Sequence, residues 1–103
     1  MLAGSGAVET RIFMAGNWEA EPTVLSVLAV DAEPLVRARV ALNHTVPPET
    51  LEALSTDPVE QVRINVSRNW DTPPTVLLRL LGDASPAVRF WAGQNPSTGS
   101  TTK

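Results

Sequence analysis

Residues 69–94 read NWDTPPTVLLRLLGDASPAVRFWAGQ, and this stretch decides the fold because the chain contains it three times. Residues 17–42 read NWEAEPTVLSVLAVDAEPLVRARVAL, and residues 43–68 read NHTVPPETLEALSTDPVEQVRINVSR. The copies align without a gap, in a constant step of 26 residues. A repeat of this length is typical of stacked helical or superhelical architectures.

Several columns hold the same residue in every copy. They are Asn17, Asn43 and Asn69; Leu25, Leu51 and Leu77; Leu28, Leu54 and Leu80; Asp31, Asp57 and Asp83; and Arg37, Arg63 and Arg89. We therefore predict one domain with a partial repeat at 1–16, full repeats at 17–42, 43–68 and 69–94, and the start of a further repeat at 95–103. The Ser/Thr/Gly residues that end the chain have no apolar anchor, so we expect a disordered tail.

Each unit contains two helical stretches. The first is the PPxxLxxL segment, whose two leucines lie on one helical face, and Thr72 is placed to cap a helix that begins at Pro73. This helix is about two turns long, short enough to be partly of the tighter 3₁₀ type. The Asp column opens the second helix, and Asp57 with Glu60 forms a capping-box pattern.

One apolar stripe per helix cannot be buried within a single unit, so neighbouring units must share a core. Small residues at Ala15, Ala41, Ser67 and Gly93 would let adjacent helices approach closely. The predicted fold class is all-α, a superhelical solenoid of about three and a half units.

The NxxTPPxxLxxL stretch, clearest at residues 69–80, resembles the leucine-rich repeat variant family, together with the Asp column and the Val-Arg pair before the next Asn. The resemblance covers residues 8–96. It implies a right-handed superhelix that alternates an α-helix with a short 3₁₀-like helix, and a binding scaffold rather than an activity. The iron–sulfur segment of the family's type member is not carried over, because this chain has no cysteine.

Composition argues against several classes of function. The absence of Cys and the single histidine, His44, make a metal or cofactor site improbable, and no pattern of a nucleophile or a phosphate loop occurs. We predict no catalytic, metal or cofactor residues. A net charge of −3 is unfavourable for nucleic-acid binding, and no apolar run is long enough to cross a membrane. Missing cysteines and a missing secretion signal fit a cytoplasmic protein.

Two polar columns are better explained by structure than by ligand binding. Asn17, Asn43 and Asn69, with Asn95, repeat at the end of one helix and are expected to hold turn backbone. The Arg column, joined at the N-terminal side by Arg11, could grip an acidic partner. The structural interpretation is that each Arg pairs with a member of the Asp column or with carbonyls at a helix end.

The aromatic residues are the best candidates for an interaction surface. Phe90 shares a column with Ile12 and Ile64 and is expected in the core, whereas the columns of the other four contain polar residues. Exposed Trp beside Arg is typical of interface anchors, although each Trp could instead cover a seam between units or an end of the stack. The candidate surface is Phe13, Trp18, Arg37, Arg39, Arg63, Trp70, Arg89 and Trp91.

The leading hypothesis is a non-enzymatic scaffold that binds a protein or peptide. In residues 17–42 and 43–68 acids outnumber bases, which favours a partner with some positive charge there. One alternative is nucleic-acid binding, which requires the Arg and Trp columns to share a face. Another is self-assembly, such as a homodimer through uncapped repeat ends, and the chain could also be part of a larger protein.

Overall fold

The computed structural model describes residues 5–98, and the side chains of residues 7–98. This part of the chain is all-helical, with seven α-helices and one short 3₁₀ helix. Of the tail predicted to be disordered, Ser97 and Thr98 belong to the 3₁₀ helix, and residues 99–103 lie outside the described part. The helices are α1 (Ser5–Ala15), α2 (Pro22–Leu28), α3 (Pro34–Leu42), α4 (Pro48–Leu54), α5 (Glu60–Arg68), α6 (Pro74–Leu80), α7 (Pro86–Gln94) and η1 (Pro96–Thr98).

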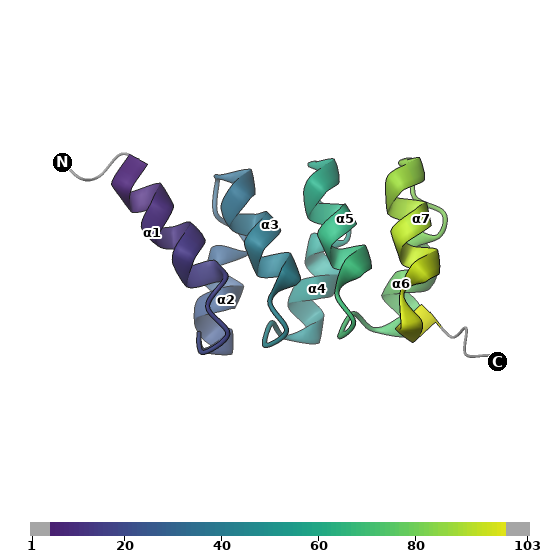
Figure 1. The fold of residues 1–103 in the computed structure, drawn as a ribbon, viewed down its shortest axis with the longest axis horizontal. Coiled ribbons are helices and arrows are strands. Elements are labelled where there is room, and N and C mark those ends of the chain that lie inside the picture. The colour runs from purple at the N-terminus through teal and green to yellow at the C-terminus, as the bar shows by residue number, and fades with distance from the viewer. Residues whose placement is uncertain (1–4, 99–103) are drawn as a thin grey trace.

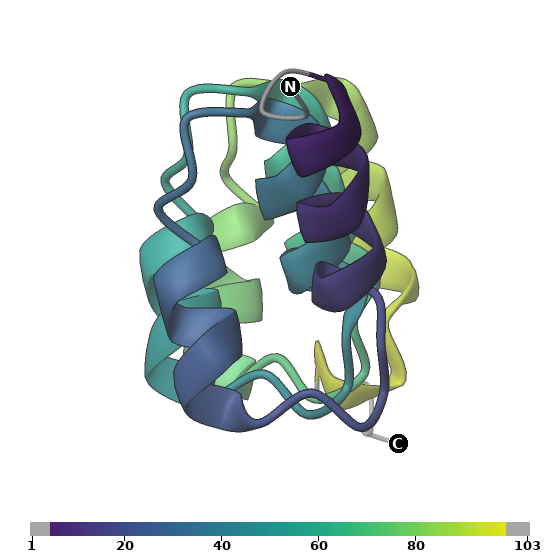
Figure 2. The ribbon, with the colours of Figure 1, turned by 90° about the vertical axis from the view of Figure 1, so that its left-hand side faces the viewer.

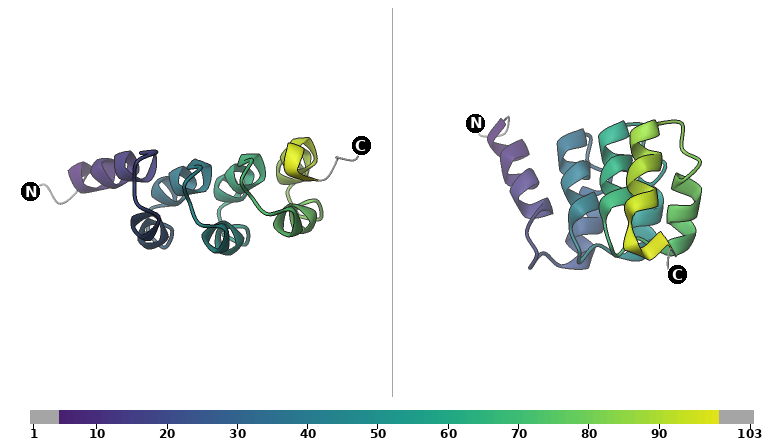
Figure 3. Two further views of the ribbon diagram at one scale, coloured as in Figure 1. Left: turned by 90° about the horizontal axis from the view of Figure 1, so that it is seen from below. Right: turned by 45° about the vertical axis from the view of Figure 1, so that its right-hand side comes forward.

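The helices form two layers, as Figures 1 and 2 show. Helices α1, α3, α5 and α7 stand side by side along the long axis and pack directly on one another, and α2, α4 and α6 form the second row (Figure 3). The principal extents are 52 × 26 × 17 Å. The molecule is therefore a flat, elongated stack in which each 26-residue step adds one helix to each layer.

The short helices α2, α4 and α6 are α-helical, so the prediction of a 3₁₀-like helix in each unit is wrong. Their first turns close with bonds between residues four apart, such as the Leu25 N–H to the Glu21 carbonyl at 3.1 Å. Proline stands in the first turn of each of these helices, where its missing N–H costs no intrahelical bond and its fixed φ favours the helix. Only the segment after Asn95 is 3₁₀ among the described residues.

The predicted helix caps are also wrong in detail. Helix α6 begins one residue later than expected, at Pro74, because the Thr72 hydroxyl is buried and donates to the Val66 carbonyl at 2.7 Å. Asp57 does not cap α5: its carboxylate accepts from the Val59 N–H at 2.9 Å, within the turn before the helix. Glu60, the other half of the expected capping box, instead accepts from the Ser85 hydroxyl.

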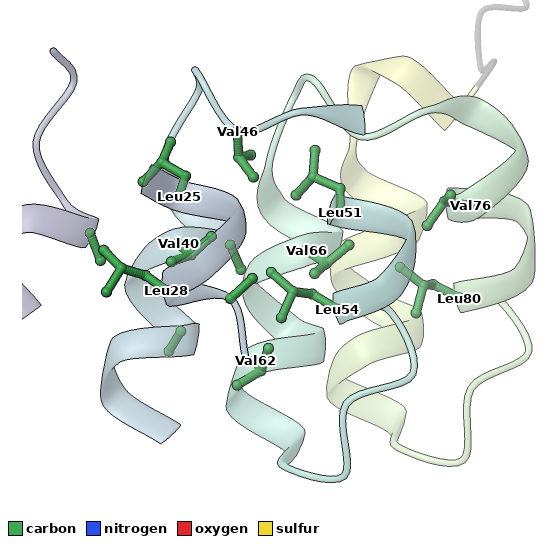
Figure 4. Packing of buried hydrophobic residues seen from close by; sticks show 14 of the residues in the cluster. Leu25, Leu28, Val40, Val46, Leu51, Leu54, Val62, Val66, Val76 and Leu80 are labelled. Atoms are coloured by element: carbon green, nitrogen blue, oxygen red, sulfur yellow. The ribbon is translucent and has the colours of Figure 1, made fainter. Parts of the chain in front are cut away.

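The core lies between the two layers (Figure 4). Its largest members are the leucines of the short helices and the valines of the long ones, and Leu25, Leu51 and Leu77 are fully buried. The two leucine columns of the short helices and the valine columns of the long helices recur as buried apolar residues at the repeat period, so successive units extend one apolar layer. The small column behaves as expected in the first three units, where Ala15, Ala41 and Ser67 are fully buried, while Gly93 in α7 is exposed.

Phe90 is 57% exposed, so the prediction that it lies in the core is wrong. Its column faces the next long helix: Ala38, the member in α3, accepts a hydrogen bond from Asn65 of α5, and Ile12 and Ile64 pack against the core. Helix α7 has no following long helix in the described part of the chain, so Phe90 has nothing to cover it.

Candidate interaction surface

The Asn column is structural, as predicted. The Asn43 amide donates to the carbonyls of Ala15 and Asn17, both at 2.9 Å, and its oxygen accepts from the Thr45 N–H. Asn69 and Asn95 make the same three contacts one and two units further on. Each side chain thus ties the end of a long helix to the preceding unit, and both N–H groups of its amide are used in doing so.

The Arg and Asp columns form a ladder of ion pairs between successive units. Arg11 pairs with Asp31 at 2.6 Å, and the same contact joins Arg37 to Asp57 at 2.7 Å. Arg63 and Asp83 make the third rung at 3.0 Å. The structural interpretation is therefore confirmed for these three arginines.

The ladder also sets the electrostatics of its carboxylates. The hydrogen bond from Arg11, helped by the Glu33 N–H, lowers the pKa of Asp31 below its ordinary value. Partial burial would raise the pKa of Asp83, but the hydrogen bonds from Arg63 and the Ser85 N–H outweigh it and leave that pKa lowered. These carboxylates stay ionised and bound to their arginines at neutral pH.

Two members of the candidate surface, Arg37 and Arg63, are therefore occupied inside the stack. Arg89 repeats the ladder's backbone contacts, since it donates to the Asp83 carbonyl at 2.8 Å, but within residues 7–98 no carboxylate completes its rung. These arginines lie in the first turns of the long helices, whereas Trp18 and Trp70 follow the C-terminal ends of long helices. The Arg and Trp columns do not share one face.

The Trp columns are exposed. Trp18, Trp70 and Phe13 are 68%, 72% and 71% exposed, and Trp91 is 38% exposed. No indole N–H of the described residues makes a protein hydrogen bond, which leaves three donors without a protein acceptor. Trp is enriched among the anchor residues of interfaces, so these side chains mark a candidate binding surface.

The aromatic residues line two small pockets on the side of the long helices. The N-terminal pocket is formed by Gly16, Trp18, Arg39, Leu42 and Asn43, with Phe13 beside it. The C-terminal pocket, of about 190 Å³, is formed by Arg68, Trp70, Trp91, Gln94 and Asn95. Each residue of the second pocket occupies the repeat position of its counterpart in the first, two units further along the chain. The fold therefore forms a pocket at the same repeat positions twice, with Trp and Asn in common and different residues at the other three positions.

Each pocket combines a tryptophan with an arginine that lacks a carboxylate. A Cβ built on Gly16 would lie 3.5 Å from Nη1 of Arg39, so this guanidinium reaches across to the end of the preceding long helix. The corresponding contact in the C-terminal pocket is between Arg68 and Trp91, whose guanidinium carbon lies 4.9 Å from the ring centroid. Neither Arg39 nor Arg68 has an ion pair within residues 7–98.

The unit between the pockets carries a more polar version of the same site. His44 stands in the Trp position and meets Trp18 edge-on, with 4.6 Å between ring centroids. Asn65 stands where the pockets have Arg39 or Trp91, and it is buried and hydrogen-bonded to Gln61 and Ala38. The two aromatic pockets are thus separated by polar side chains.

Sequence reasoning missed Arg68, Leu42 and Gln94 as members of this surface. All three occupy the residue before Asn in the repeat, a column without chemical similarity between copies. The available signal was position: this residue lies two positions before the Trp column in sequence, and Gln94 lies one helical turn after Trp91.

A groove of about 530 Å³ lies elsewhere, between α2 and α4. Several of its polar groups are already satisfied within the fold, because the Ser26 and Thr50 hydroxyls bond to each other and Arg37 pairs with Asp57. This groove offers little unsatisfied chemistry to a ligand.

No family model, curated protein or solved structure matches the chain. Within residues 5–98, no helix is long and apolar enough to cross a membrane. The described part of the chain also holds no group of three or more His, Asp or Glu side chains placed to bind a metal ion.

Proposed function

We propose that this chain is a non-enzymatic repeat scaffold that binds a protein or peptide through the two aromatic–arginine pockets. The observation that carries the proposal is their duplication. Trp18 and Trp70 occupy equivalent positions two units apart. Each pocket also holds one arginine without a carboxylate partner, Arg39 in the first and Arg68 in the second, at different positions of the repeat. Trp and Arg are the residues most often found as binding anchors in interfaces.

For the architecture we propose a right-handed helical solenoid of the kind the leucine-rich repeat variant family implies. The two layers and the contacts that recur at each 26-residue step support it. Such stacks present extended surfaces whose side chains come from the same position in successive units, which suits partners that lie along several units.

Counting charges by unit favoured a partially basic partner, but the contacts change this expectation. Asp31 and Asp57 are neutralised by arginines of the preceding units, and the unpaired charges at the pockets are Arg39 and Arg68. A partner with acidic groups therefore suits the pockets better.

Nucleic-acid binding is the less favoured alternative. It needs the Arg column beside the Trp column, yet Arg37 and Arg63 are consumed by ion pairs at the other ends of the long helices. The residues that follow Trp18 and Trp70 are the exposed acids Glu19 and Asp71, which would repel a phosphate backbone.

Self-association is a second candidate, favoured by one observation at the C-terminal end of the stack. There Phe90 and Leu81 are exposed, and Arg89 lacks the carboxylate that completes the earlier rungs. A dimer that covers this end would give a mass that rises with concentration in light scattering, and Phe90→Ser would abolish the rise.

The test of the main proposal is selection from a random peptide library displayed on phage. The baits are the wild-type chain, a Trp18→Ala/Trp70→Ala/Trp91→Ala variant and a Val27→Ala control, each shown by circular dichroism to be folded. Val27 is as exposed as Trp18, at 69%, but lies in the other layer. Peptides enriched by wild type and control but not by the triple variant support the proposal. Equal enrichment by all three would show that the aromatics are not anchors.

A further inference from the structure

We infer that the two aromatic–arginine pockets together bind one extended, proline-rich peptide that carries an acidic residue beside each anchor. The inference rests on the proposed function and specifies its ligand. It depends on four features of the described residues: the spacing of the pockets, the polar surface between them, the indole N–H donors without a protein acceptor, and the two arginines without an ion pair.

The spacing follows from the stacking of the long helices. Packed helices lie about 8–10 Å apart, so equivalent points on α3 and α7 are separated by about 16–20 Å. A polyproline II peptide advances about 3.1 Å per residue and would cover that distance in about six residues. A single short peptide can thus place one anchor in each pocket.

The surface between the pockets disfavours a helical ligand. An amphipathic helix would lay a continuous apolar stripe on the surface, with side chains about 5 Å apart along its axis. Between the pockets this stripe would meet the exposed, polar side chain of His44. Strand addition is also disfavoured, because residues 5–98 contain no sheet edge that could pair with a peptide backbone.

The free hydrogen-bond donors match an extended peptide. A polyproline II segment makes no internal hydrogen bonds, so its carbonyls need donors from the partner. The indole N–H groups of Trp18, Trp70 and Trp91 have no protein acceptor, and neither does the amide of Gln94. Aromatic side chains that offer apolar faces and N–H donors are the usual means of recognising proline-rich segments.

Charge complementarity predicts where the peptide carries its acidic residues. Each pocket contains one arginine without a carboxylate partner, Arg39 in the first and Arg68 in the second. A Glu or Asp of the peptide next to each anchor would form an ion pair with that arginine. Glu19 and Asp71 lie beside the tryptophans and make a polyanion unfavourable, while leaving room for isolated carboxylates. This difference favours an acidic peptide over single-stranded nucleic acid.

The test is a titration of the wild-type chain with fluorescein-labelled synthetic peptides, followed by fluorescence anisotropy. The first peptide carries two Pro-Pro-Glu triplets joined by Gly-Ser-Gly, which sets equivalent residues about six apart, as the spacing requires. The comparisons are a single triplet with the same linker, a peptide with Gln in place of both Glu, and labelled oligothymidine. Proteins are the wild type, Trp18→Ala, Trp70→Ala and the Val27→Ala control.

We expect the two-triplet peptide to bind about tenfold more tightly than the single triplet, because the second contact becomes intramolecular. Either tryptophan variant should abolish that advantage, the Gln peptide should bind more weakly, and Val27→Ala should behave as wild type. Equal binding of one and two triplets, with only one tryptophan mattering, would overturn the two-pocket inference and leave the scaffold proposal standing. Binding of oligothymidine alone, or of no probe at all, would also overturn it, and the phage selection then decides the broader proposal independently.

Discussion

The substitution Asn69→Ala tests how the units are held together. The Asn69 side chain is buried and donates to the carbonyls of Ala41, at 2.8 Å, and Asn43, at 3.2 Å. Its oxygen accepts from the Asp71 N–H at 2.8 Å. Alanine would remove all three bonds at the junction between two units.

The expected loss follows from the state of each partner. The Ala41 carbonyl lies in the last turn of α3, where no helical N–H reaches it, so it would be left buried without a donor at a cost of about 1–3 kcal/mol. The Asp71 N–H can turn to water, which limits that loss to about 0.5–1 kcal/mol. We expect Asn69→Ala to lower the free energy of unfolding by about 2–4 kcal/mol, a large part of the stability of a small domain.

Asn17→Ala is the matched control, because Asn17 has the same repeat position at the first unit. It is exposed, and its side chain makes a single hydrogen bond within the described residues, from the Glu19 N–H at 2.9 Å. Its loss should be no more than about 1 kcal/mol. Urea unfolding followed by circular dichroism measures both variants, with the slope checked for constancy. Equal losses for Asn17→Ala and Asn69→Ala would refute the argument that bonds to the preceding unit carry the stability.

Three further expectations can be checked with the same unfolding assay. Leu51→Ala should lower the free energy of unfolding by about 2–5 kcal/mol, because Leu51 is fully buried. Val27→Ala should change it by less than about 0.5 kcal/mol. A small effect of both substitutions would mean that Leu51 is not part of the core. Since the pKa of Asp83 is lowered in the folded state, its stabilising contribution should be present above the unfolded value of about 3.9 and be lost as the pH falls through the folded pKa; Asp83→Asn should flatten the acid limb of a stability–pH curve, and an unchanged curve would contradict this. Phe90→Ala should cost no more than about 1 kcal/mol, because the exposed ring retains chiefly its edge contact with Trp91, and a loss as large as that of Leu51→Ala would mean that Phe90 is covered in solution.

The parts of the fold that were predictable are those that repetition makes redundant. The recurrence of Leu25, Leu51 and Leu77 was sufficient to identify the buried face of the short helices, and all three are fully buried. The ladder was foreseeable for a related reason: columns of opposite charge that step at one period provide partners at every junction. The sequence did not show which Asp each Arg reaches, because the partner 20 residues away lies in the next unit.

The errors arose where a local rule competed with a contact to a neighbouring unit. Capping patterns placed Asp57 and Thr72 at helix starts, but Arg37 of the preceding unit draws the Asp57 carboxylate, and a buried carbonyl takes the Thr72 hydroxyl. The prediction that Phe90 is buried was wrong because a contact to a neighbouring unit is missing rather than added. Its column is buried only where a following long helix covers it, and column membership carries no information about that neighbour.

The candidate site was predictable only in part. The polar His44 in their column made Trp18 and Trp70 candidates for exposed positions, whereas the pockets themselves combine positions from three successive units. Arg68 has no chemical match in its own column, so only the stacked arrangement associates it with Trp91.

The contacts of the Asn column join residues 26 positions apart, so they fix the register of successive units. Removal of residues 43–68 would join Leu42 to Asn69 and present Asn69 to the carbonyls of Ala15 and Asn17, with Arg37 facing Asp83, so every junction would find a replacement partner. A deletion whose length is not a multiple of 26 residues would leave the Asn and Arg columns out of register together. The distance between the two pockets can therefore change only by whole repeats, through insertion or deletion of 26 residues. The length of the peptide that spans the pockets would change by a fixed amount with each repeat.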